Sequence, residues 1–176
     1  MSETLKRVEQ EIPRLRRYAR YLTRDADQAD DLVQECLTRA VAKIDSWRQG
    51  TNLRAWLFVI LKNCDINDIR RNRRMDIDHD ASGDHHSALA IPPGQEAHIA
   101  LLEVRDAFMR LNVEHREVLL LVAIEGLEYQ EAAAILDVPL GTIRSRLSRA
   151  RRALRDALGD GYEASEPRSA QGNSLG

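Results

Sequence analysis

The chain has 176 residues, 43% of them hydrophobic and 5% aromatic, with a formal net charge of −2. This length allows one domain or two small ones, and the low aromatic content favours helical packing. No apolar run approaches the roughly 20 residues needed to span a bilayer, and the N-terminal segment lacks the apolar core of a signal peptide. We therefore expect a cytoplasmic protein without membrane insertion. Cys36 and Cys64 fall in helical apolar patterns and are expected to be buried, reduced thiols.

The small net charge conceals an uneven distribution along the chain. Residues 1–74 hold 16 basic and 11 acidic residues, whereas residues 75–97 hold five acidic residues and no lysine or arginine. Residues 98–158 balance at nine and nine, and residues 159–176 carry one arginine against three acids. Basic surface is therefore local, and the near-neutral total does not exclude a nucleic-acid partner.

Three helices are predicted in the basic N-terminal part. Pro13 suits the first turn of the first helix, and apolar spacing predicts the other two over residues 27–43 and 53–71. On the second helix an exposed acidic and amide strip is expected, which could dock a basic partner. Its members are Asp31, Gln34, Glu35 and Thr38. The alternative is that acidic residues near this helix start only complement the helix dipole.

A polar loop over residues 45–52 separates the second and third helices and contains Trp47. An aromatic ring in such a loop could stack on a nucleic-acid base, but it could equally be a core residue, and the residues leave both interpretations open. Trp56, on the apolar side of the third helix, is expected in the core. That helix ends in an arginine cluster, which includes Arg70 and Arg71.

Residues 75–97 lack periodicity, contain two adjacent prolines and are expected to form a flexible linker. The linker predicts that the parts on either side of it tumble semi-independently. Its histidines and aspartates do not match the spacing of a metal site, so no metal is expected; they are His79, His85, His86, Asp78, Asp80 and Asp84. The tail over 159–176 is rich in Gly, Ser and Asn and is expected to be disordered.

Two helices joined by a tight turn are predicted near the C-terminus, over residues 129–136 and from residue 141 onward. Proline at position 139 ends the first, and Thr142 is a plausible N-cap of the second. Helices over 98–111 and 114–123 are expected to pack against this pair and complete a four-helix domain. In the last helix an apolar stripe alternates with six arginines, and no acidic residue occurs from 141 to 155. This pattern is typical of a helix-turn-helix that reads the DNA major groove; the alternative is a solvated arginine face on a core helix.

No phosphate-binding glycine loop and no nucleophile or carboxylate pair is evident, so neither catalysis nor a cofactor is expected. Three stretches resemble the extracytoplasmic-function (ECF) sigma factors of bacterial RNA polymerase. Residues 31–35 (DLVQE) are similar to the family's region 2.2. Residues 50–57 (GTNLRAWL), continuing to Asn63, are similar to regions 2.3 and 2.4. Residues 127–154, which include GTIRSR at 141–146, are similar to region 4.2.

The resemblance implies an all-α chain with two small helical domains, a σ2 domain over 1–74 and a σ4 domain over 98–158, joined by a flexible linker. It also implies three groups of site residues: Asp31, Gln34 and Glu35 for the β′ coiled coil of core RNA polymerase; Trp47, Asn63, Arg70 and Arg71 for the −10 element; and Arg144, Ser145, Arg146, Ser148, Arg149 and Arg152 for the −35 element. Ser148 departs from relatives that carry an aromatic residue there, which leaves the −35 sequence open. The acidic linker would thread the polymerase.

The implied protein is a promoter-specificity subunit, monomeric when free, with core RNA polymerase, promoter DNA and an anti-sigma factor as partners. A stand-alone helix-turn-helix regulator is the first alternative, but the acidic strip and the loop that contains Trp47 would have no role in it. A sigma-like decoy for an anti-sigma factor is the second, but it would not need an intact arginine helix.

Overall fold

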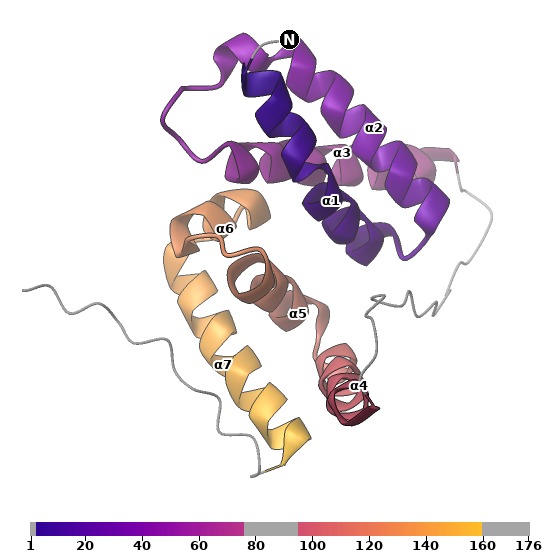
Figure 1. Cartoon of the computed structure of the whole chain (residues 1–176), viewed down its shortest axis with the longest axis vertical. Helices are drawn as coiled ribbons and strands as arrows, with labels where there is room; N and C mark the ends of the chain where they lie inside the picture. Colours follow the sequence, from indigo (N-terminus) through magenta and orange to yellow (C-terminus); the bar gives the residue numbers. More distant parts are fainter. Residues whose placement is uncertain (1–2, 76–94, 160–176) are drawn as a thin grey trace, which may run out of the picture.

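A computed structural model of the chain describes residues 3–75 and 95–159, and within these ranges every regular element is a helix (Figure 1). The elements in chain order are α1 (Glu3–Thr23), α2 (Ala26–Ala42), the 3-10 turn η1 (Ile44–Ser46), α3 (Leu53–Met75), α4 (Gln95–Arg110), α5 (Val113–Leu119), the π-helical turn η2 (Leu120–Ile124), α6 (Tyr129–Leu136) and α7 (Leu140–Leu158). The all-α fold with two small helical parts is confirmed. No helix in these ranges carries an apolar stretch that could cross a membrane.

The N-terminal half is a three-helix bundle in which α1, α2 and α3 each pack on the other two. Asp25 begins α2 because its side chain accepts a hydrogen bond from the Gln28 amide at 2.8 Å. Aromatic rings fill the centre of the bundle: the fully buried rings of Tyr18 and Phe58 stack with centroids 5.0 Å apart. Both thiols are buried as expected, and burial raises the pKa of Cys36 to about 12.

The C-terminal half places α5 and α6 against α7, with α4 packed on α7 as well. A capping box starts α6, in which the Glu131 carboxylate accepts from the Glu128 amide at 2.8 Å. The helix is capped at its C-terminus by Asp137, whose φ of 51° lies in the left-handed region. A residue in this conformation ends a helix and turns the chain, here toward α7.

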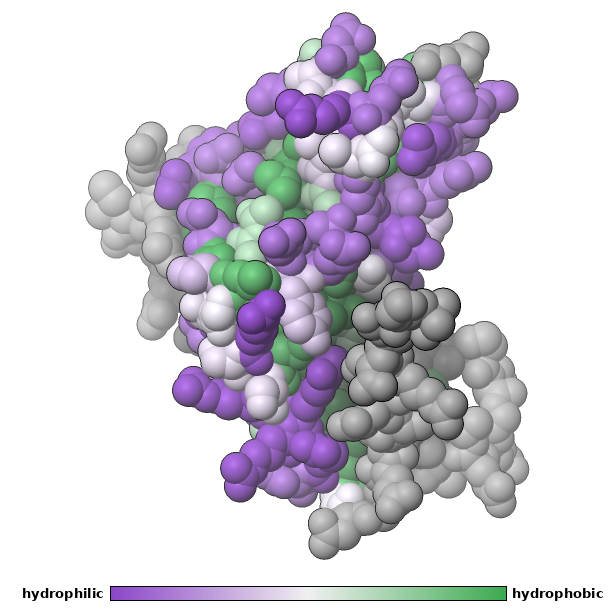
Figure 2. Space-filling model, turned by 90° about the vertical axis from the view of Figure 1, so that its left-hand side faces the viewer, coloured by the Kyte–Doolittle hydropathy of each residue, from purple (hydrophilic) through white to green (hydrophobic). Residues whose placement is uncertain are grey.

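The two halves pack against each other, since α3 contacts α6 and one continuous cluster of buried residues runs through both. Figure 2 shows one face of the molecule on which hydrophobic residues reach the surface in an interrupted strip between hydrophilic ones. The expectation of two semi-independent halves is therefore wrong for this structure. Of the expected linker, residue 75 ends α3 and residues 95–97 begin α4; residues 76–94, with the linker histidines, and the tail from residue 160 lie outside the described residues.

Two local expectations were also wrong. Pro13 lies inside α1 rather than in its first turn, because the helix already begins at Glu3. Pro13 donates no backbone hydrogen bond to the turn before it. The turns of α1 before Pro13 are nevertheless held on the bundle, because Val8 is buried there at 5% exposure. Thr142 is not an N-cap: α7 starts at Leu140, and the Thr142 amide donates to the Pro139 carbonyl at 2.9 Å within its first turn.

Candidate nucleic-acid interface

The exposed side of α7 carries polar side chains above a buried apolar stripe. Ile143, Leu147 and Ala150 are at most 2% exposed and fix the rotation of the helix on its neighbours. The side chains between them near the helix N-terminus are therefore turned to solvent: Arg144, Ser145, Ser148 and Arg149 are all exposed. This is the end that a helix-turn-helix inserts into the major groove.

Two of the six arginines of α7 are engaged in ion pairs. Arg146 is only 21% exposed in its side chain and contacts the Glu114 carboxylate of α5 at 2.8 Å. Arg152 and Asp156, one turn apart, are both highly exposed and 4.0 Å apart, so this pair is weak. Residues 141–155 hold no acid, but the fold supplies partners from outside that segment: Glu114 of α5 holds Arg146, and Asp156 lies near Arg152. Arg144 and Arg149 are exposed.

The acidic strip on α2 is present. Asp31, Gln34 and Thr38 are exposed, and Glu35 is half-buried. Glu35 is ion-paired with Arg39 one turn later, so part of its charge is already compensated within the helix. Within residues 3–75 and 95–159 the strip thus offers the carboxylate of Asp31 without an ion pair, the amide of Gln34 and the paired carboxylate of Glu35 on a single face.

The loop tryptophan is a core residue in this structure. Trp47 is 6% exposed, and the Arg7 guanidinium lies over its ring at 5.3 Å from the centroid. Its indole N–H is buried without a hydrogen-bond partner among the described residues. The alternative of an exposed stacking ring is therefore wrong for this conformation, because the polar loop folds back on α1.

The other residues expected at the −10 element all lie on α3. Asn63 is exposed in the middle of the helix, with Cys64 buried beside it. Arg70 and Arg71 are exposed near its end, and Arg71 contacts Asp68 at 3.0 Å. The α3 surface thus presents a polar amide followed by basic groups.

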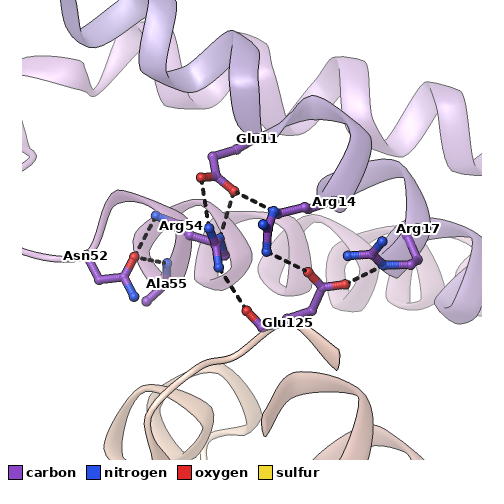
Figure 3. A network of polar contacts seen from close by, with 7 residues as sticks. All are labelled: Glu11, Arg14, Arg17, Asn52, Arg54, Ala55 and Glu125. Atoms are coloured by element: carbon purple, nitrogen blue, oxygen red, sulfur yellow. Dashed lines mark hydrogen bonds and ion pairs between the residues drawn. The ribbon is translucent and has the colours of Figure 1, made fainter. Parts of the chain in front are cut away.

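A buried glutamate between the two halves is the main feature that the sequence did not predict (Figure 3). Glu125 follows the π-helical turn and is completely buried. Its Oε1 accepts from Arg17 Nε at 2.7 Å, and its Oε2 lies 3.9 Å from Arg14. Arg54 Nη1 donates to the Glu125 backbone carbonyl at 2.9 Å, while its Nε donates to Glu11 at 2.8 Å. Two arginines of the N-terminal half therefore face the Glu125 carboxylate and a third binds its backbone carbonyl. The hydrogen bond to Glu125 raises the pKa of Arg17.

A second polar cluster joins the halves around Glu117 on α5. One of its carboxylate oxygens accepts from the Tyr18 hydroxyl at 2.9 Å and from Lys62 at 2.7 Å. The Tyr21 hydroxyl also donates to the Val113 carbonyl at 3.2 Å. For Glu125, the signal available in the sequence was its place as the one acid in the apolar segment 118–127. A charge in such a run must find partners when it is buried.

Comparison with known proteins places both halves in recognised families. The family described as "Sigma2 domain of PhyR" matches residues 8–62, and "Sigma-70, region 4" matches residues 101–154. The ECF RNA polymerase sigma factor EcfG of Rhodopseudomonas palustris (strain TIE-1) is 48% identical over 143 residues, which are 81% of this chain and 78% of the relative.

Two further relatives agree with this match. The ECF RNA polymerase sigma factor SigC of Mycobacterium tuberculosis (strain CDC 1551 / Oshkosh) is 37% identical over 145 residues, which are 78% of this chain and 74% of the relative. Among solved structures, the sigma factor RpoE in complex with the anti-sigma factor NepR from Bartonella quintana superposes with a TM-score of 0.71 at 35% identity. That superposition covers 92% of this chain and all of the other.

Proposed function

The chain belongs to the extracytoplasmic-function sigma factors of bacterial RNA polymerase, and we propose that it directs the polymerase core to promoters through the surfaces described above. The C-terminal half reads the −35 element with α7. The N-terminal half docks on the core through the strip on α2 and engages the −10 element through α3 and the preceding loop.

The exposure pattern of α7 carries this proposal. Arg144 and Arg149 are exposed in the part of the helix that enters the major groove. Arginine pairs with guanine in a bidentate manner, and one such pair is worth about 1–3 kcal/mol of discrimination between bases. Arg152, one turn nearer the C-terminus, is suited to a phosphate contact, which carries no direct sequence information. Arg146 contributes by fixing α7 on α5, because its guanidinium is held by Glu114.

The −10 surface does not present an exposed aromatic ring on which a base could stack directly. Trp47 lies beneath Arg7, so its ring can meet an unstacked base only after that arginine and the loop have moved. Asn63 is exposed already and can offer base-edge hydrogen bonds without rearrangement. By analogy with the relative solved with NepR, we also propose that an anti-sigma protein restrains this chain.

Transcription in vitro with purified core polymerase and a promoter library tests the proposal. The wild-type chain should select promoters that share a −35 and a −10 element. Arg149→Ala should flatten the preference at one −35 base pair, a change of about 1–3 kcal/mol. Arg152→Ala is the matched control: it should weaken all promoters alike and lower the slope of log affinity against log salt by about 0.9.

Two results would contradict the proposal. A wild-type chain that binds an anti-sigma protein but supports no transcription with the core would be a decoy. A chain that binds a palindromic site as a dimer without the core would be a stand-alone regulator. If Arg149→Ala weakened every −35 variant equally, the assignment of that side chain to base reading would be wrong.

A further inference from the structure

The start of α1 lies against the loop that joins η1 to α3 (Figure 1). The contact is made by Arg7, whose guanidinium lies over the Trp47 ring at 5.3 Å from its centroid. A cation in this position is attracted by the negative face of an aromatic ring. Arg7 is itself exposed, whereas Trp47 is 6% exposed. A flexible, solvated side chain therefore lies between this face of the buried ring and water.

Neither polar group of this contact has a conventional partner. The indole N–H of Trp47 is buried and donates to no acceptor among residues 3–75 and 95–159. In the same part of the chain no carboxylate forms an ion pair with Arg7. Most buried donors in native structures are satisfied, so an orphaned one calls for an explanation. The contact thus breaks neither a hydrogen bond of the indole nor an ion pair of the arginine when it separates.

The backbone of the loop is held more firmly than the arginine that covers it. The Trp47 amide donates to the Ile44 carbonyl at 3.1 Å, and the Thr51 hydroxyl donates to the Arg48 carbonyl at 2.7 Å. Gly50 supplies the φ of +91° that the turn between them requires. Exposed side chains change rotamer within picoseconds to nanoseconds, whereas loops move more slowly. The first part of this cover to move is therefore the Arg7 side chain.

A nucleotide carries the two groups that suit this site. Every base has a flat π-face, which stacks on an aromatic ring irrespective of the base sequence. The phosphate carries a negative charge that a guanidinium binds in a bidentate manner. Base and phosphate of one nucleotide are joined through a single sugar, so a base that replaces Arg7 on the ring brings an anion close to the displaced cation.

We propose that Arg7 gates the −10 site: its guanidinium occupies the position of an unstacked base on Trp47 in the free chain, and it turns away to bind a phosphate of the strand when the base arrives. This inference rests on the proposed function, because it names the residue that admits a base to that surface. The phosphate contact offsets the loss of the contact with the ring. In the free chain, the same side chain keeps an aromatic ring out of water.

Acrylamide quenching of Trp47 fluorescence tests the covering role on the free, full-length chain. The chain has two tryptophans, so Trp56→Phe leaves Trp47 as the single fluorophore. In this background Arg7→Ala should raise the quenching constant severalfold, while circular dichroism stays unchanged because Arg7 is exposed. Addition of core polymerase and a −10 strand to the chain with native Arg7 should shift the emission of Trp47, since a base then replaces the guanidinium on its ring.

Binding of a single-stranded −10 oligonucleotide to core polymerase saturated with the full-length chain tests the phosphate contact. The strand comes from a promoter selected from the library, and a methylphosphonate replaces each phosphate in turn. Arg7→Ala should weaken binding about tenfold through the loss of one charge-assisted hydrogen bond and lower the slope of log affinity against log salt by about 0.7. One methylphosphonate should weaken wild type by a similar factor but leave Arg7→Ala unchanged, because both changes remove the same contact.

The matched control is Arg20→Ala, which removes the same charge from an exposed position nearer the end of α1. It should leave both the quenching constant and the methylphosphonate pattern at their wild-type values. Arg7→Lys separates the two roles of the side chain, because lysine keeps the charge but lacks the planar guanidinium. It should retain the salt slope and increase quenching of Trp47.

Two outcomes would overturn the inference: a quenching constant that Arg7→Ala leaves unchanged, or methylphosphonates that weaken Arg7→Ala as much as they weaken wild type at every position. Both can occur in a chain that transcribes normally, so they are distinguishable from a failure of the proposed function. A wild-type chain that selects no promoter with the core would refute the proposed function, and the −10 role of Arg7 with it.

Discussion

Charge reversal on the α2 strip tests polymerase docking with a large expected effect and a small structural cost. Asp31→Arg combined with Glu35→Arg changes two acidic side chains one turn apart on an exposed face. If both meet arginines on one partner helix, reversal at the interface costs several kcal/mol. A loss of about 4 kcal/mol weakens binding about a thousandfold.

The cost to the fold is smaller, and the structure sets its size. Glu35 is paired with Arg39 at i,i+4, and their side chains are 31% and 40% exposed. Exposed pairs of this kind contribute about 0.3–0.5 kcal/mol, and the like-charge pair that replaces it costs a similar amount. The total is below about 1 kcal/mol, so the variant should remain folded while it loses affinity for the core.

The assay is titration of labelled chain with purified core polymerase, alongside thermal melting followed by circular dichroism. Glu9→Arg combined with Asp45→Arg is the control, since both residues are exposed on the same half and the net charge changes equally. If the control loses as much affinity as the strip variant, net charge rather than the strip is responsible. Unchanged affinity of a folded strip variant would refute the docking role outright.

Three further results are expected. Asn63→Ala, at an exposed position, should leave closed-complex binding intact and impair strand opening; a permanganate footprint equal to wild type would place the −10 contact elsewhere. Trp47→Ala should lower the free energy of unfolding in urea by about 3–5 kcal/mol, because the ring is 6% exposed; a change below about 1 kcal/mol would show that it is not a core residue. The free energy of unfolding should fall as pH rises above about 9. Burial raises the pKa values of Cys36 and Tyr21 to about 12, so the unfolded chain loses these protons at a lower pH than the folded chain does. A urea midpoint that is constant or rises between about pH 8 and 10.5 would contradict this.

Local patterns in the sequence were sufficient for the helices and for the helix-turn-helix. The apolar spacing that predicted a helix over 129–136 agrees with α6, and the stripe of Ile143, Leu147 and Ala150 is buried as expected. These features depend on residues a few positions apart, so periodicity and breaking residues specify them. The same spacing determined that Arg144 and Arg149 are exposed.

Tertiary structure alone decided which polar groups are engaged with one another. Arg146, like Arg144 and Arg149, lies between the apolar positions of the last helix, so the sequence alone does not distinguish it from them. In the structure, Glu114 of α5 binds Arg146. Trp47 lies in a polar loop, but the loop folds onto α1 and buries the ring beneath Arg7. Arg17 and Glu125 are 108 positions apart. A single sequence carries no periodic signal for such a pair, because the pair depends on how the two halves pack against each other. That packing lets arginines take the place of water around the carboxylate.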